Sequence, residues 1–183
     1  MTHQLADLWE DLVDELGDER EAVVVRSEEH GERRLTHAQL EARANRLAHH
    51  LRDCGVGVGS TIGCHVHNGT EYLEAMLAAY KLRAIPINLN HRDVAEELRY
   101  HFEDASPVVV LTEPDLADRV HEAGPPPHVL VRGEDYEAVL AASSPERIEV
   151  PGRSNDDIYL LYTGGTTGMP KGCLLYTSDA ADE

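Results

Sequence analysis

Tyr162-Thr-Gly-Gly-Thr-Thr-Gly-Met-Pro-Lys-Gly172 is the stretch around which the rest of the chain is organised. The four residues before it, 158–161, are apolar and β-prone, which predicts a strand that delivers the chain into a loop. Glycines let the backbone turn its N–H groups toward a ligand, and threonine hydroxyls add neutral hydrogen-bond donors. Lys171 adds a mobile positive charge. This combination of groups is typical of a loop that holds a polyphosphate.

The order of residues separates this stretch from the Walker A loop, in which Gly-Lys-Ser/Thr stands at the mouth of a helix. Here Lys171 follows Pro170 and precedes Gly172, so the lysine lies on a stiffened exit from the loop. The stretch instead resembles, at nearly every position, the phosphate-binding signature of the adenylate-forming enzymes. This superfamily includes the acyl-coenzyme A synthetases, the adenylation domains of peptide synthetases and firefly luciferase.

Further segments carry the same resemblance and extend it over residues 5–172. Residues 35–40 and 42–48 look like the first helix block of the family, and residues 78–88 look like the second. Leu98-Arg-Tyr100 stands where acyl-coenzyme A synthetases often carry a similar tripeptide. The resemblance implies an α/β fold, namely the incomplete N-terminal part of the large domain of the adenylate-forming fold, with a mostly parallel sheet and flanking helices.

The resemblance also implies a reaction and a set of contacts. In the family, the signature holds the β- and γ-phosphates of ATP while a substrate carboxylate attacks the α-phosphorus, and a thiol, commonly coenzyme A, then takes the acyl group. The donors of the loop and Mg²⁺ would neutralise charge on the departing pyrophosphate. The residues that the resemblance assigns to phosphate contact are Thr163, Gly164, Gly165, Thr166, Thr167, Gly168 and Lys171. Serine is frequent in the family where Gly164 stands, so one hydroxyl donor is absent.

The remaining parts of the family's site lie downstream of this signature, so the chain is expected to be the first third of such an enzyme, inactive alone and without a catalytic residue. The favoured parent is an ATP-dependent acyl-coenzyme A synthetase for a fatty or related carboxylic acid, because Asn88-Leu-Asn90 and Glu97-Leu-Arg-Tyr100 look like the fatty-acyl branch. The alternatives are an amino-acid adenylation domain of a peptide synthetase and, in another class, a stand-alone nucleotide-binding module.

The last eleven residues, 173–183, resemble the translation of a transposase-type sequencing adapter. On this interpretation the AMP-binding domain covers residues 1–172, the natural sequence in hand ends at Gly172, and the tail was never selected to pack. The tail is therefore expected to be poorly ordered. A genuine acidic C-terminus is the alternative.

Composition narrows the classes of function. The chain has 183 residues, of which 42% are hydrophobic and 27% charged, as in an ordinary globular domain. A net charge of −18 argues against nucleic acid as a partner, because phosphate backbones attract basic surfaces. No apolar run is long enough for a transmembrane segment and no secretory signal is visible, so a cytoplasmic protein is expected. Three cysteines without metal-ligand spacing suit a reducing compartment.

Hydrophobic periodicity predicts alternating strands and helices, which indicates an α/β fold with a largely parallel sheet. The predicted strands cover residues 22–25, 32–35, 61–66, 85–89, 108–111, 128–131 and 158–161. The predicted helices cover 4–16, the run between Thr36 and Gly55, segments opened by Thr70 and by Asp93, and 114–123. Thr36 with Gln39 and Asp93 with Glu96 are expected to form capping boxes. Residues 141–155 are expected to form a surface link.

Three details of this pattern are specific enough to check. The third helix is expected to bury Leu73, Met76, Leu77 and Tyr80, and the next one Val94, Leu98 and Phe102. Pro86 indicates an edge strand or a bulge.

Other clusters of polar residues have structural interpretations that we favour over catalytic or metal-binding ones. Cys64, His65 and His67 lie close in sequence but lack further ligands for a zinc or copper site. Asp156 and Asp157 are adjacent on a strand and point to opposite faces, which does not suit a shared metal. We therefore expect no metal-binding residues in this segment, and the sequence does not indicate an oligomeric state.

Overall fold

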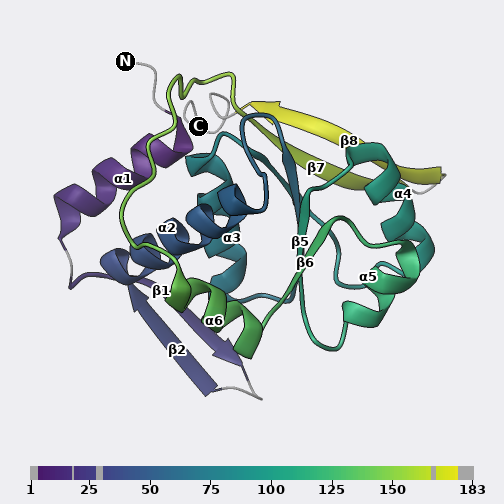
Figure 1. The fold of residues 1–183 in the computed structure, drawn as a ribbon, viewed down its shortest axis with the longest axis horizontal. Coiled ribbons are helices and arrows are strands. Elements are labelled where there is room, and N and C mark those ends of the chain that lie inside the picture. The colour runs from purple at the N-terminus through teal and green to yellow at the C-terminus, as the bar shows by residue number, and fades with distance from the viewer. Residues whose placement is uncertain (1–3, 18, 28–30, 166–167, 177–183) are drawn as a thin grey trace.

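The computed structural model describes residues 4–17, 19–27, 31–165 and 168–176, and its main feature is a six-stranded sheet between two groups of helices (Figure 1). The helices are α1 (Leu5–Leu16), α2 (His37–Asp53), α3 (Thr70–Lys81), α4 (Ala95–Ala105), α5 (Ala117–Ala123) and α6 (Glu134–Ala142). The strands are β1 (Glu21–Ser27), β2 (Gly31–Thr36), β3 (Thr61–His65), β4 (Ile85–Asn88), β5 (Val109–Thr112), β6 (His128–Val131), β7 (Ile158–Gly165) and β8 (Gly168–Tyr176).

The main sheet has the strand order β6-β5-β3-β4-β7-β8. The first five strands in this order pair in parallel, and β8 pairs antiparallel with β7. Strands β1 and β2 form a separate antiparallel ribbon. The predicted α/β fold with a mostly parallel sheet is confirmed.

Helices cover both faces of the main sheet, as βα crossovers require (Figure 1). On one face, α2, α3 and α6 pack against β3 around a core that includes Leu47, Ala78 and Leu140. On the other face, α4 and α5 pack against β4 and β5 around Leu98 and Val120. The sheet is thus buried on both sides, which explains the nearly continuous apolar strands in the sequence.

The capping residues predicted from the sequence are confirmed for one helix and wrong for two others. Thr36 and Gln39 form the predicted capping box, with Thr36 Oγ1 accepting from the Gln39 amide at 3.2 Å and Gln39 Oε1 accepting from the Thr36 amide at 2.9 Å. Two other predictions were wrong by one residue. Gly69, not Thr70, is the N-cap of α3. Val94, not Asp93, is the N-cap of α4, and its amide donates to Glu97 rather than to Glu96.

The predicted buried face of α3 was wrong for most of its residues. Leu73 is 38% exposed, and Met76 and Leu77 are half-buried. The helix instead turns Ala75, Ala78 and Ala79 inward. Small side chains let α3 lie close against α2, and this packing outweighs the preference for burying the larger residues. On α4, Leu98 and Phe102 are buried as predicted, but Val94 is exposed.

Pro86 does not mark an edge strand, because β4 lies between β3 and β7. Pro86 is in register with Ile62 of β3, without a bulge in that pair of strands. Strand β7 pairs with β4 only from Ile87 onward, so the missing N–H of the proline falls outside that ladder.

The link over residues 141–155 was only partly predicted. Helix α6, which precedes it, was missed, although residues 143–155 do lack further helices or strands. The expectation of a surface link was wrong in one respect, because Ile148 enters the core and is only 3% exposed. Two arginines on the same link, Arg147 and Arg153, reach back to α1.

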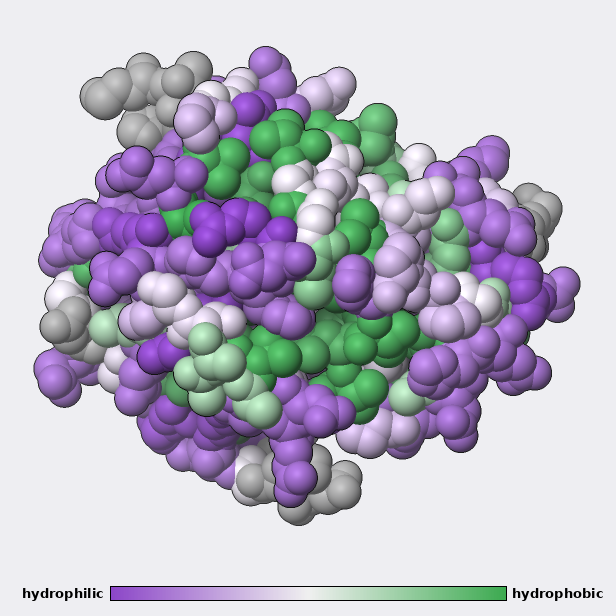
Figure 2. Space-filling view, in the orientation of Figure 1, coloured by the Kyte–Doolittle hydropathy of each residue, from purple (hydrophilic) through white to green (hydrophobic). Residues whose placement is uncertain are grey.

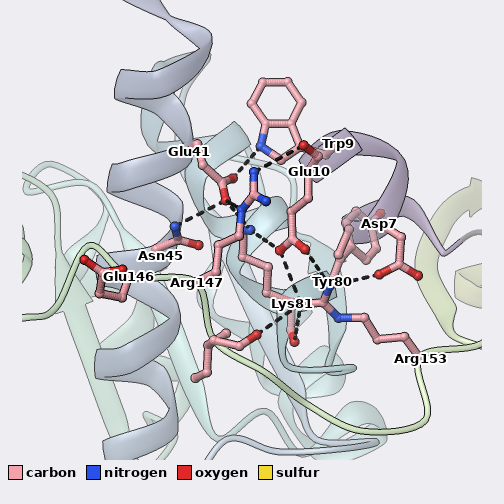
Figure 3. A network of polar contacts seen from close by, with 12 residues as sticks. Asp7, Trp9, Glu10, Glu41, Asn45, Tyr80, Lys81, Glu146, Arg147 and Arg153 are labelled. Carbon is pink, nitrogen blue, oxygen red and sulfur yellow. Dashed lines mark hydrogen bonds and ion pairs between the residues drawn. The ribbon is translucent and has the colours of Figure 1, made fainter. Parts of the chain in front are cut away.

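Lys81 is the centre of a buried network that joins this link to three helices (Figure 3). Its side chain is fully buried, and Nζ donates to Glu10 of α1 at 2.5 Å and to Glu41 of α2 at 2.8 Å. Arg153 also donates to Glu10, at 2.8 Å, and Arg147 donates to Glu41, at 3.1 Å. Each buried carboxylate therefore has two cationic partners, which compensates for its removal from water.

Hydrophilic and hydrophobic residues are unevenly distributed over the surface. Hydrophilic residues dominate the flanks of the face shown in Figure 2, and hydrophobic residues gather across its middle. Within the described part of the chain, no helix combines the length and the apolar composition that are needed to span a membrane.

Candidate phosphate-binding site

The glycine- and threonine-rich signature forms a β-hairpin rather than the predicted loop. Strand β7 extends to Gly165 and strand β8 starts at Gly168, and the two pair in an antiparallel ladder. Tyr162 lies opposite Gly172 and Thr163 opposite Lys171. Thr166 and Thr167, two of the predicted phosphate contacts, lie outside the described residues.

Two predicted contacts lie side by side across this hairpin. Thr163 and Lys171 are directly paired, so their side chains project from the same face of the ribbon, and both are exposed. The Thr163 hydroxyl donates to the carbonyl of Lys171 at 3.4 Å. The hairpin thus presents a hydroxyl and an ammonium together.

The other predicted contacts are glycines close to the turn. Gly165 lies opposite Gly168, and the register of the pairing shifts between Thr163 and Gly165, at the position of Gly164. The absence of side chains leaves backbone N–H groups approachable in this region. The structure therefore brings Thr163, Gly164, Gly165, Gly168 and Lys171 into one short ribbon.

The hairpin lies at the carboxyl end of the parallel sheet. Leu160 and Leu161 of β7 pair with Ile87 and Asn88, the last residues of β4, and the hairpin continues beyond them. In open α/β sheets, ligands commonly bind outside the carboxyl ends of the strands. The position of the hairpin is thus suitable for a ligand that also touches the loops after β3 and β4.

A cavity of about 540 Å³ opens beside the hairpin. Its walls come from the loop after β3, from α3, from the end of β4 and the loop after it, from α4 and from the hairpin. They include Asn68, Tyr72, Asn88, Asn90, Asp93, His101, Tyr162 and Pro170. In the sequence, Asn88 and Asn90 indicate only the branch of the family. Their position at the carboxyl end of a parallel strand, with Asn88 as its last residue and Asn90 just beyond it, is the signal that could have placed them at a site.

Tyr162 joins the base of the hairpin to α4. Its hydroxyl donates to Asp104 Oδ2 at 2.6 Å, and its ring centroid lies 4.2 Å from that of His101. Burial raises the pKa of Tyr162, and the hydrogen bond to the Asp104 carboxylate raises it further. The phenol therefore stays protonated and remains a hydrogen-bond donor at neutral pH.

Comparison with known proteins agrees with this geometry. A family model described as "AMP-binding enzyme" matches residues 12–181. The chain belongs to the AMP-binding enzyme family. It is 43% identical over 190 residues to a 3-oxocholest-4-en-26-oate–CoA ligase of Rhodococcus rhodochrous, covering 95% of this chain and 33% of that protein. It is 42% identical over 189 residues to a medium/long-chain-fatty-acid–CoA/3-oxocholest-4-en-26-oate–CoA ligase of Mycobacterium marinum, with 93% and 33% covered.

Among solved structures, the anthranilate CoA ligase AuaEII superimposes with a TM-score of 0.87 at 21% identity, covering 97% of this chain and 35% of that one. This likeness shows the fold. The chain spans about a third of the length of the curated relatives that it matches. The part in hand contains the hairpin of the signature and the sheet from which that hairpin extends.

A second and larger cavity lies between the β1–β2 ribbon and the ends of β3, β5 and β6. Its volume is about 630 Å³, and Arg33 and Arg132 line it. Both guanidinium groups pair with Glu71, and Arg132 also pairs with Glu113 at 2.8 Å. Because these positive charges are already compensated, this cavity is a poorer site for phosphate than the hairpin.

The two histidines and the cysteine in and after β3 differ in burial and in hydrogen bonding. His65 is buried with Nδ1 3.3 Å from Thr112 Oγ1, and burial lowers its pKa to about 4. Burial raises the pKa of the Cys64 thiol to about 12. His67 instead faces solvent beside Asp115. Within the described residues, no three histidine, cysteine or acidic side chains form a group that could hold a metal ion.

The terminal segment differs from expectation. Residues 173–176 continue β8, with Cys173 opposite Leu161 and Tyr176 opposite Ile158, so the expectation of poor order was wrong for these four residues. Their side chains are exposed. Apolar, β-prone residues can extend a hairpin whatever their origin, because the pairing uses the backbone. Residues 177–183 lie outside the described part of the chain, and the adapter origin stays a prediction.

Proposed function

We propose that the β7–β8 hairpin binds the β- and γ-phosphates of ATP. The contacting residues are Thr163, Gly164, Gly165, Thr166, Thr167, Gly168 and Lys171. The observation that carries the proposal is the direct pairing of Thr163 with Lys171, which presents a hydroxyl and an ammonium together at the carboxyl end of the sheet. Charge-assisted hydrogen bonds of this kind each contribute roughly 1.5–3 kcal/mol.

The donor set of the hairpin fits a polyphosphate but not a metal ion. Residues 158–176 contain no carboxylate, whereas Mg²⁺ takes oxygen ligands, usually including one or two carboxylates. The hairpin residues therefore do not hold the Mg²⁺ that accompanies ATP in this kind of reaction.

We assign the chain to an ATP-dependent acyl-coenzyme A ligase. In that reaction a carboxylate displaces pyrophosphate from ATP, and coenzyme A then takes the acyl group from the adenylate. Within this chain, Lys171 and the N–H groups of the glycines would hold the pyrophosphate part in place and stabilise the charge that develops on it. The thiol step has no assigned residue in this chain.

A fatty or related apolar acid is the substrate class that we favour. Support comes from the relatives, which are named as ligases of fatty acids and of a sterol-derived acid, and from the Asn88-Leu-Asn90 form of the loop after β4. The free thiols of Cys54 and Cys64 suit a reducing compartment, so we place the reaction in the cytoplasm.

The experiment is hydroxamate formation by the protein extended to the full length of its relatives, across fatty, aromatic and steroid acids and the amino acids. We expect turnover of apolar acids and formation of coenzyme A thioesters. Activity confined to amino acids, without a thioester, would show an amino-acid adenylation domain instead. ATP binding without any acid-dependent pyrophosphate exchange would indicate a nucleotide-binding module.

A further inference from the structure

The phosphate-binding hairpin has little main-chain support from the rest of the sheet. Two residues of β7, Leu160 and Leu161, are in register with β4. Beyond Leu161 the ribbon continues with β8 as its partner. A two-stranded ribbon is marginally stable by itself. The orientation of Thr163 and Lys171 therefore depends on what holds the ribbon at its base.

Tyr162 is the first residue beyond that supported region, and its side chain contacts Asp104 and His101 of α4. Helix α4 lies beside the hairpin in Figure 1. The phenol donates to Asp104 at 2.6 Å, and the ring rests against His101 with an interplanar angle of 57°. Gly172 of β8 lies opposite Tyr162 and close to its ring: a Cβ at this position would be in ordinary contact with Tyr162 Cε1, at 3.4 Å, and tight against a methyl carbon of Leu160, at 3.1 Å. Three elements thus meet at one side chain.

Helix α4 is a firm support for this contact. Leu98 is fully buried, and Phe102 packs in the same core cluster. His101 is only 2% exposed, and its Nε2 lies 3.4 Å from the carboxylate of Asp93. Because this part of α4 is fixed to the sheet, a contact with α4 transfers that rigidity to the hairpin.

We infer that Tyr162 is a positioning residue, held by Asp104 and His101 of α4, that fixes the direction of the phosphate-binding hairpin. This inference rests on the proposed function, because the groups that it positions are Thr163 and Lys171. A site held in its binding geometry before the ligand arrives loses less conformational entropy on binding. The hydrogen bond to Asp104 fixes the orientation of the Tyr162 side chain, which packing of the ring against His101 alone would not do.

The experiment compares Tyr162→Phe, Asp104→Asn and the double variant of the 183-residue chain. Two readouts are used: hydrogen exchange of peptides that cover residues 158–176, and affinity for inorganic tripolyphosphate by calorimetry. Tyr162→Phe keeps the ring and removes the hydroxyl, so packing on His101 is retained. Glu103→Gln is the matched control, because Glu103 is an exposed carboxylate adjacent to Asp104 on the same helix.

We expect Tyr162→Phe to speed exchange in the hairpin and to weaken tripolyphosphate binding roughly tenfold, as for one lost hydrogen bond to a charged acceptor. Asp104→Asn keeps an acceptor oxygen but removes its charge, so we expect a smaller change in the same direction. The double variant is expected to add little to Tyr162→Phe, because both changes act on the same bond. Exchange in Tyr162→Phe equal to that in Glu103→Gln would overturn the inference. Failure of the unsubstituted chain to bind tripolyphosphate would contradict the proposed function instead, so the two failures are distinguishable.

Discussion

Replacement of the buried Lys81 by methionine tests the network that ties the N-terminal helix to the rest of the domain. Methionine keeps an unbranched apolar side chain in the site but removes the ammonium group. Glu10 and Glu41, whose side chains are 14% and 8% exposed, then each lose a hydrogen bond, of 2.5 and 2.8 Å. Breaking a buried ion pair generally costs about 3–5 kcal/mol.

The expected loss for Lys81→Met lies at the lower end of that range. Glu10 keeps Arg153, and Glu41 keeps Arg147 and the indole N–H of Trp9. We therefore expect a decrease in the free energy of unfolding of about 3 kcal/mol. For a domain of this size, that corresponds to a fall in Tm of roughly 6–12 °C.

The assay is urea unfolding at pH 7, followed by circular dichroism, with the m-value checked for two-state behaviour. Arg26→Ala is the control, because it breaks an ion pair with Glu32 in which the arginine side chain is 76% exposed. Such surface pairs contribute about 0.2–1 kcal/mol. A loss in Lys81→Met no larger than in Arg26→Ala would refute the reasoning.

The pH dependence of this variant gives a second check. Burial alone would raise the pKa of Glu10, but hydrogen bonds from Arg153 and Lys81 outweigh it and hold the pKa below its ordinary value. The stabilisation from Glu10 is therefore present above the ordinary carboxyl pKa of about 4.3 and is lost as the pH falls through the lowered folded value. We expect the difference between Lys81→Met and the unsubstituted chain to narrow in acid.

Three further predictions concern His65, catalysis and the terminal segment. Burial lowers the pKa of His65 to about 4, so between about pH 6.5 and 4 the unfolded chain binds more protons and stability falls as the pH drops. His65→Gln should weaken that dependence in urea unfolding, and an unchanged pH profile would contradict the assigned environment. Acid-dependent exchange of pyrophosphate into ATP by the 183-residue chain should not exceed the blank; clear exchange would show that the groups downstream in the family are dispensable. Sequencing of an independent clone should diverge after Gly172 into apolar coding sequence, whereas recovery of residues 173–183 followed by a stop codon would disprove an adapter origin.

The fold could be predicted where the signal is local. The capping box of Thr36 and Gln39 involves residues three apart, and the alternation of strands and helices follows from hydrophobic periodicity. The faces of α3 could not be predicted, because α2 and the sheet decide which side is buried. Ile148 and Lys81 were missed for the same reason, since their partners lie far away in the sequence.

In the candidate site, too, contacts between residues far apart in the sequence could not be predicted. The composition of the signature predicts a phosphate site, which stays a prediction, and it predicted a loop where β8 pairs with β7. Residue types alone do not show that two glycine-rich segments pair with one another. The contact of Tyr162 with Asp104 joins residues 58 positions apart and could not be inferred from either segment.

The most direct test of the account is where a polyphosphate contacts this chain. Tripolyphosphate is titrated into the isotopically labelled 183-residue chain while the backbone amide resonances are followed by NMR. We expect the largest shifts within residues 163–171, and we expect Lys171→Ala to weaken binding by roughly 10- to 100-fold, in line with the loss of a charge-assisted bond. Arg26→Ala, which removes the same charge at a distance, should have little effect. Shifts centred on Arg33 and Arg132, with no effect of Lys171→Ala, would contradict the assignment of the hairpin as the phosphate site.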